Sequence, residues 1–177
     1  MPIRVEARRL LLTALLLGTA CARAAPFEPA GLDDDRLGAW TPDATATILH
    51  QAICKLDDPA LVVVSDPSTW RALWTQAWGG IQLSPALPGV DFVLSSVIVV
   101  ALGKRSGLGY SVTIDSVVVR TVGAVLYATE LQPGAHCDTG AGDSAPVHMV
   151  LAPGHPPNFD WRVTPTRRDC ATSAPRP

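Results

Sequence analysis

The sequence lacks the features that several classes of protein require. It has no C-x-x-C and no H-x-x-x-H spacing, so the paired ligands of common zinc sites are missing. After Leu17 no apolar run approaches the roughly 20 residues that cross a bilayer as a helix. Lysine and arginine never form a run longer than two, and the formal net charge is −2. These absences argue against a metal centre, a membrane-spanning segment after Leu17 and a nucleic-acid partner.

Residues 1–24 have the pattern of a secretory signal peptide. Three arginines give a positive start, an apolar run covers residues 10–17, and small residues around Cys21 offer cleavage sites. Removal of this segment takes away four arginines and one glutamate, which leaves a net charge of about −5. We therefore expect an extracytoplasmic protein, located in the periplasm or cell envelope or secreted.

Cys21 has two possible fates. Residues 18–21, Gly-Thr-Ala-Cys, resemble a bacterial lipoprotein box, although Gly18 stands where that box usually has leucine. Either Cys21 is lipidated and becomes the new N-terminus, or it is removed with the signal peptide. Both outcomes leave the rest of the chain without a transmembrane anchor.

The remaining chain divides into three parts. Residues 25–45 are rich in Ala, Pro, Gly and Asp and predict a flexible tether. Residues 46–170 are long enough to form a single domain with its own core. Residues 171–177 predict a disordered tail.

One helix is predicted at residues 67–78. Ser65 or Asp66 can cap it, Pro67 suits its first turn, and three tryptophans and a leucine follow at helical spacing. The indoles share one face, which predicts a helix that packs against a sheet. Alternatively, this row of tryptophans forms a binding platform for a small ligand.

The other periodic segments predict β-strands. Residues 92–102 are almost wholly apolar, which is typical of a central strand, and residues 110–122 alternate in polarity. Further strands are expected at residues 61–64, 124–131, 147–151 and 157–163. The predicted fold class is therefore mainly β (α+β): an antiparallel β-sandwich or partly open barrel with one packed helix.

Residues 103–109, GKRSGLG, hold three glycines and predict positive backbone angles or a close approach of the backbone. A strand rather than a helix follows and no Gly-Lys-Ser/Thr element is present, so we expect neither a phosphate loop nor a cofactor. The segment is either a simple hairpin turn or a rim loop that contacts a partner. The candidate partner-binding residues are Lys104, Arg105, Gly107, Gly109 and Tyr110.

Three short sets of residues imitate catalytic or metal sites. Residues 138–140, Asp-Thr-Gly, match the catalytic turn of aspartic proteases, but those enzymes need two such carboxylates. Residues 142–144, Gly-Asp-Ser, resemble a serine-protease loop in a chain too short for that fold. A metal set of His136, Asp138, Asp143 and His148 has the spacing of a loop followed by a strand. We predict no catalytic residue and no metal site.

The order of these segments resembles the C-terminal domain of the protease complex subunit PrcB family over about residues 60–165. The resemblance is carried by S-D-P-S-T-W-R-A-L-W, V-D-F, G-x-x-x-G-x-G-Y-S-V-x-I and P-V-H-M-V. Two departures are the insertion of Leu108 in the glycine turn and the glycine-rich stretch 138–144. The resemblance implies an exported accessory domain without activity of its own.

Similar members of that family often carry a cysteine before the last core strand and another near the C-terminus. The resemblance therefore pairs Cys137 with Cys170 and leaves Cys54 free or buried. A disulfide also suits the expected oxidising compartment.

The function expected from the sequence is a non-enzymatic extracytoplasmic accessory module that binds a protein, with an exported protease as the first candidate. One alternative is protease inhibition by the hairpin loops around Gly107 and Gly142. The other is a small-ligand-binding envelope domain whose site lies beside the helix tryptophans.

Overall fold

The structure is a computed structural model that describes residues 36–79, 84–156 and 158–170. The predicted signal peptide, Cys21, the first part of the tether (residues 25–35) and the C-terminal tail lie outside these residues. Within the described ranges, no helix is long and apolar enough to cross a membrane.

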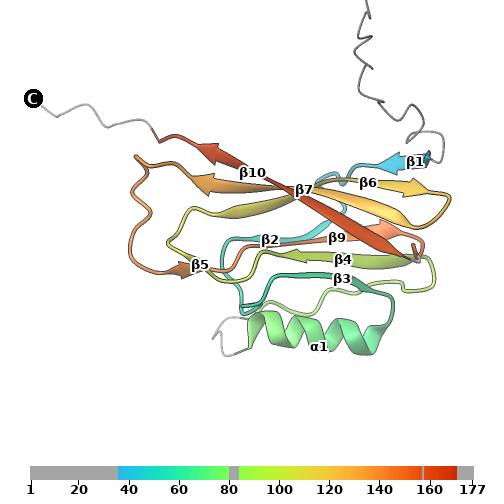
Figure 1. Cartoon of the computed structure of the whole chain (residues 1–177). Coiled ribbons are helices and arrows are strands. Elements are labelled where there is room, and N and C mark those ends of the chain that lie inside the picture. Colours follow the sequence, from blue (N-terminus) through green and yellow to red (C-terminus); the bar gives the residue numbers. More distant parts are fainter. Residues whose placement is uncertain (1–35, 80–83, 157, 171–177) are drawn as a thin grey trace, which may run out of the picture. The chain divides into compact units, whose positions relative to one another are not determined.

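Two four-stranded sheets and one helix form the described domain, which confirms the predicted sandwich with a packed helix (Figure 1). Neither sheet closes into a barrel. Sheet A contains, in spatial order, β1 (Arg36–Trp40), β6 (Ser111–Arg120), β7 (Ala124–Pro133) and β10 (Phe159–Arg168). Sheet B contains β2 (Thr47–Gln51), β9 (Val147–Pro153), β4 (Ser95–Ala101) and β3 (Ala60–Val64). A small ribbon pairs β5 (Arg105–Ser106) with β8 (Asp143–Ser144).

Both edge strands of sheet A differ from the sequence prediction. β1 forms inside residues 36–45, which the composition assigns to a flexible tether, and pairs antiparallel with β6. β10 extends past the predicted end at residue 163 to Arg168 and pairs in parallel with β7. Both strands are largely exposed and therefore carry little apolar alternation, and their partners are distant in sequence.

The long apolar segment becomes β4, which is buried on both faces as predicted. Val97 and Val99 pack toward the helix, whereas Ile98 and Val100 pack toward sheet A. The alternation produces two cores, one between the sheets and one between sheet B and the helix. Each such aliphatic side chain contributes roughly 1.5–3 kcal/mol when fully buried.

The helix α1 (Pro67–Trp78) occupies the predicted residues. Asp66 caps it, because its carboxylate accepts hydrogen bonds from the Ser68 hydroxyl and from the backbone N–H groups of Ser68 and Thr69. These bonds lower the pKa of Asp66 to about 2. The cap satisfies N–H groups that have no partner inside the helix.

The helix tryptophans belong mainly to the core. Trp70 and Trp74 are 2% and 6% exposed and pack on sheet B. Their indole N–H groups donate to the backbone carbonyls of Pro88 and Pro85 in the segment that follows the helix. The two indoles are therefore enclosed by protein rather than open to a ligand.

Candidate functional site

One end of the sandwich brings two loops together. The glycine loop (residues 103–110) connects β4 to β6, and the disulfide loop (residues 134–142) connects β7 to β8. The backbone N–H of Gly107 donates to the carbonyl of Gly142 at 2.9 Å, and the β5–β8 ribbon joins the same segments. We call these two loops together the loop end.

The glycine loop has the positive backbone angles that its composition predicts. The φ angle is 72° at Gly103, 97° at Gly107 and 93° at Gly109. A Cβ atom at Gly103 would also lie 2.6 Å from the nitrogen of Pro59, so the backbones approach too closely for any side chain. The positive φ angles and the close approach at Gly103 restrict the loop to few backbone conformations.

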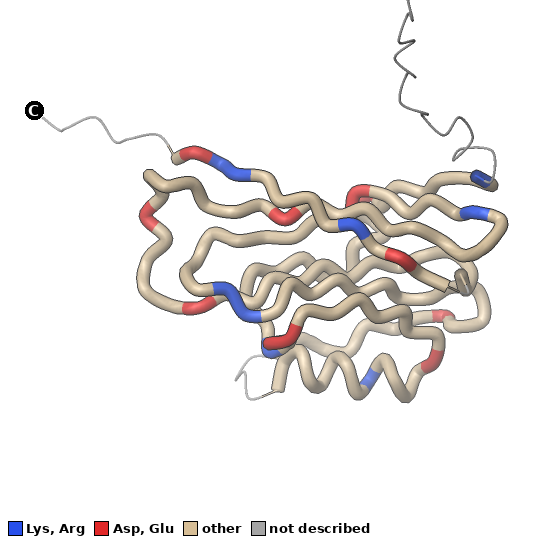
Figure 2. Tube along the Cα trace, viewed as in Figure 1, with Lys and Arg blue, Asp and Glu red and all other residues tan. Residues whose placement is uncertain are grey.

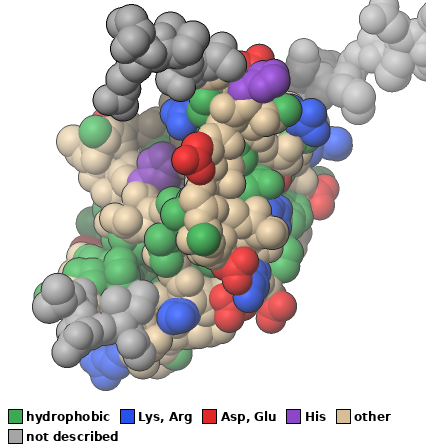
Figure 3. Space-filling view, turned by 90° about the vertical axis from the view of Figure 1, so that its left-hand side faces the viewer, with side chains coloured by type: hydrophobic (Ala, Val, Ile, Leu, Met, Phe, Trp, Pro, Cys, Tyr) green, Lys and Arg blue, Asp and Glu red, His purple; other side chains and the backbone are tan. Residues whose placement is uncertain are grey.

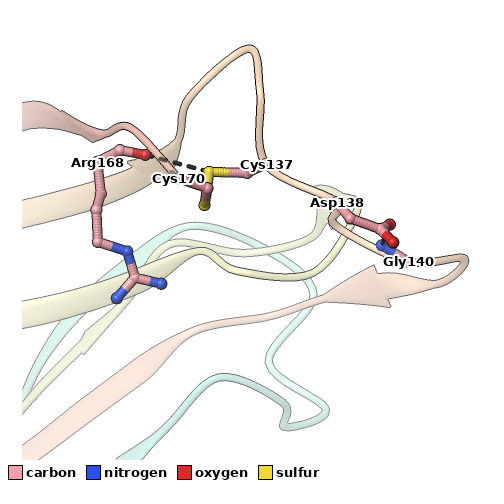
Figure 4. The surroundings of a disulfide bond; sticks show 5 residues. All are labelled: Cys137, Asp138, Gly140, Arg168 and Cys170. Carbon is pink, nitrogen blue, oxygen red and sulfur yellow. Dashed lines mark hydrogen bonds between the residues drawn. A yellow bond between two sulfur atoms is a disulfide. The ribbon is translucent and has the colours of Figure 1, made fainter. Parts of the chain in front are cut away.

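The disulfide between Cys137 and Cys170 is present, as the family resemblance implies, and joins the disulfide loop to the end of β10 (Figure 4). The Cα atoms are 4.9 Å apart. The Cys137 sulfur also lies 3.2 Å from the carbonyl oxygen of Arg168, a contact without a donor hydrogen because the sulfur is oxidised. β7 and β10 pair as far as Pro133 and Arg168, so the disulfide restrains the loop where strand pairing ends.

Residues 138–140 and 142–144, which imitate protease motifs, stabilise the two loops through hydrogen bonds. The Asp138 carboxylate accepts a hydrogen bond from the backbone N–H of Gly140 at 3.0 Å, which forms a tight turn. Ser144 is 2% exposed, and its hydroxyl donates to the carbonyl of Gly107 at 2.8 Å. The Ser144 oxygen is therefore turned into the protein, where a substrate would not reach it.

The two cations of the glycine loop point in different directions. The Lys104 ammonium lies 2.8 Å from the Asp143 carboxylate, and both side chains are more than half exposed. Its hydrogen bond to Asp143 raises the pKa of Lys104. Arg105 is only 28% exposed and turns inward, where Nε donates to Glu130 and Nη1 to the carbonyl of Leu102. Lys104 is thus available at the surface, whereas Arg105 is largely committed to the fold.

A hollow of about 340 Å³ lies between the two loops and the disulfide. Leu108, Pro133 and the disulfide give it apolar walls, and Asp138 and Arg168 add one charge of each sign. Tyr110 is half-buried at the exit of the glycine loop.

Charge is mixed at the loop end and along the chain. Figure 3 faces this end and shows charged side chains of both signs scattered among hydrophobic and uncharged ones. Figure 2 shows lysine and arginine residues interspersed with acidic residues over the trace. Such a mixed surface suits a protein partner better than a polyanion, which requires a concentrated positive field.

His148 on β9, which the sequence analysis considered only as a metal ligand, forms a buried polar contact. The imidazole is 3% exposed, its Nδ1 accepts a hydrogen bond from the backbone N–H of Ile114 at 2.8 Å, and its Nε2 lies 3.2 Å from the Thr47 hydroxyl. Burial, with a smaller effect of the adjacent His50 ring, lowers the pKa of His148 to about 4. The ring is therefore neutral at pH 7 and carries its proton on Nε2.

The alternative metal set does not assemble around His148. Among residues 36–79, 84–156 and 158–170, no three His, Cys, Asp or Glu side chains come together in a way that could hold a metal ion. Asp143 pairs with Lys104 instead.

The chain matches no family model, and no curated protein or solved structure proved similar to it. The geometry of the loop end is therefore the main ground for a function.

Proposed function

We propose that this chain is a non-enzymatic accessory module of an extracytoplasmic compartment and that it binds a protein partner through the loop end. The joined pair of loops carries this proposal. Strand pairing, hydrogen bonds and a disulfide hold both loops on a rigid sandwich. A loop surface that is already ordered loses less conformational entropy on binding, and loops on rigid sheets commonly carry binding residues.

Two further observations support an extracytoplasmic location and a protein partner. The disulfide favours an oxidising compartment such as the periplasm or cell envelope. The order of motifs resembles the PrcB family, which makes an exported protease the first candidate partner. A lipid on Cys21 would hold the domain at a membrane surface through the tether.

The packing of Leu108 favours docking over protease inhibition. Its two terminal carbons lie 3.7 and 3.8 Å from the positions that Cβ atoms of Gly140 and Gly142 would occupy. The side chain at the tip of the glycine loop therefore contacts the disulfide loop. An inhibitor loop instead has to project its central side chain into an enzyme cleft.

Co-purification with matched arginine substitutions tests this proposal. The tagged protein is isolated from the envelope of its own cells as wild type and as Ser106→Arg, Ala141→Arg and Thr164→Arg, all at exposed positions. We expect the two loop-end variants to lose the partner and Thr164→Arg on β10 to retain it. Retention by all three variants, or equal loss from all three, would contradict docking at the loop end.

A separate assay tests the absence of catalysis. The purified protein is incubated with peptide and ester libraries beside a Ser144→Ala variant. We expect no turnover by either protein. Hydrolysis by the wild type that Ser144→Ala abolishes would overturn the non-enzymatic assignment.

A further inference from the structure

β10 and β3 are edge strands of the two sheets (Figure 1). A second hollow, of about 260 Å³, lies beside residues of β10 and the residue that precedes β3. It combines apolar walls with a buried ion pair. The lining residues are Pro59, Leu102, Arg105, Glu130, Trp161 and Val163.

The alternation of β7 places a carboxylate inside the sandwich. Ala124, Leu126 and Ala128 face inward, and Glu130 occupies the next inward position. The Glu130 side chain is only 10% exposed, and its Oε1 accepts a hydrogen bond from Arg105 Nε at 3.0 Å. Burial of this carboxylate is tolerated because a guanidinium faces it.

The ion pair leaves one acceptor and one donor open. Neither Oε2 of Glu130 nor Nη2 of Arg105 has a hydrogen-bond partner among the described residues. A carboxylate offers about four acceptor positions and a guanidinium five N–H donors, so this contact uses only part of their capacity. Both residues line the hollow, so a ligand there could meet the remaining groups.

The side chains that line the hollow favour a ligand with a flat apolar part. Trp161 is 38% exposed, and Val163, Pro59 and Leu102 provide further apolar surface. An indole face binds rings and planar groups well. The volume lies just below the roughly 300–1,000 Å³ of sites for drug-sized ligands, so the occupant is about one ring or one side chain in size.

We propose that this hollow is a binding site for a small, uncharged apolar carboxamide. The amide N–H donates to Glu130 Oε2, the amide oxygen accepts from Arg105 Nη2, and the apolar body lies against Trp161. A neutral ligand is favoured because a cation would be repelled by the guanidinium and an anion by the carboxylate. The carboxamide belongs either to a free small molecule or to a glutamine side chain of a peptide.

Benzamide is the first probe. The ¹⁵N-labelled chain, with its disulfide intact, is titrated while the indole N–H resonance of Trp161 is followed, and Trp161→Phe identifies that resonance. We expect a saturable shift with benzamide. Methyl benzoate, which keeps the ring and carbonyl but lacks the N–H donor, should produce no saturable shift.

Glu130→Gln tests the carboxylate at nearly constant shape. Its amide oxygen is needed to accept from Arg105, so its NH₂ faces the ligand and cannot accept the ligand N–H. Binding should weaken by about tenfold or more, the usual effect of losing a hydrogen bond to a charged group. Thermal unfolding checks that the Glu130→Gln variant folds. If it does not fold, Trp161→Ala, which removes the indole wall of the hollow, is used instead. In that variant benzamide should no longer shift the amide resonances of the neighbouring residues.

A second ligand, N-acetylglutamine methylamide, separates the two sources of the carboxamide. Tighter binding of this ligand assigns a peptide glutamine, and tighter binding of benzamide assigns a free molecule. The proposal is overturned if neither ligand shifts Trp161, if methyl benzoate binds as well as benzamide, or if Glu130→Gln binds like the wild type.

Discussion

The Nδ1 atom of His148 accepts a hydrogen bond from the backbone N–H of Ile114 and so links sheet B to sheet A at 2.8 Å. β1 pairs with β6 only between Val117 and Arg120, so that ladder stops short of Ile114. The pairing of β6 with β7 also shifts register between Ile114 and Ser116. The imidazole therefore provides an acceptor for a buried N–H group that lies outside the regular ladder.

This contact predicts a loss of stability in acid. The pKa of His148 is held at about 4 by burial and by His50, whereas histidine in an unfolded chain has a pKa of roughly 6.5. Below that value the unfolded chain binds a proton that the folded chain excludes, so stability is complete above about pH 6.5 and falls as the pH drops toward 4. The loss from this residue is on the order of 3 kcal/mol, measurable by urea unfolding at successive pH values.

Two variants separate His148 from other titrating groups. His148→Asn keeps an acceptor oxygen near the position of Nδ1 but does not titrate. The free energy of unfolding of this variant should therefore change little between pH 6.5 and pH 4. His50→Gln, at an exposed position on β2, should retain most of that dependence. The account of His148 is wrong if His148→Asn and the wild type lose stability in parallel.

Removing the disulfide should destabilise the domain without unfolding its core. Cys137 and Cys170 are separated by 33 positions, and closure of a loop of this length contributes about 3–4 kcal/mol in the chain-entropy description. We expect the double variant Cys137→Ala/Cys170→Ala to lose about this much in urea unfolding. A loss confined to a few tenths of a kcal/mol would show that strand pairing alone holds β10.

The thiol of Cys54 should be unreactive in the folded protein. It is 4% exposed, its S–H donates to the carbonyl of Ala145, and burial raises its pKa. Because the thiolate is the reactive form, a Cys21→Ser variant should react with a disulfide reagent at pH 7 only after urea is added. Rapid reaction in native buffer would contradict the buried position.

Gly103 should be the glycine of the loop end that is least tolerant of substitution. A Cβ there would lie 2.6 Å from the Pro59 nitrogen and 2.8 Å from the Asp57 oxygen, at a positive φ. We expect Gly103→Ala to cost about 1–3 kcal/mol. Gly89→Ala is the matched control, because no atom lies within 4 Å of its Cβ position, and it should be nearly neutral. Equal effects of both changes would refute the close approach at Gly103.

The sequence predicts elements that local signals define. Asp66, Pro67 and the tryptophan spacing lie within one segment, and the helix forms at the predicted residues. The alternation of Val112 and Ile114 likewise gives the inward face of β6. In these cases the capping residue or the period of the pattern is sufficient information.

Features that depend on distant partners could not be predicted in the same way. β1 has no alternating pattern of its own and exists because β6 offers an edge. The partner of Arg105 is a further case, because its ion pair is with Glu130, which lies 25 residues away on another strand. The inward position of Glu130 on β7 was a usable signal, as was a histidine within the apolar run of β9.

Site-specific photo-crosslinking in the native cells tests docking at the loop end most directly. A photoreactive residue is placed at Ser106 in the glycine loop, at Ala141 in the disulfide loop and, as a control, at Arg71 on α1, all of which are exposed. The account predicts that Ser106 and Ala141 capture the same protein and that Arg71 does not. Capture of that protein from Arg71 but from neither loop position would contradict it.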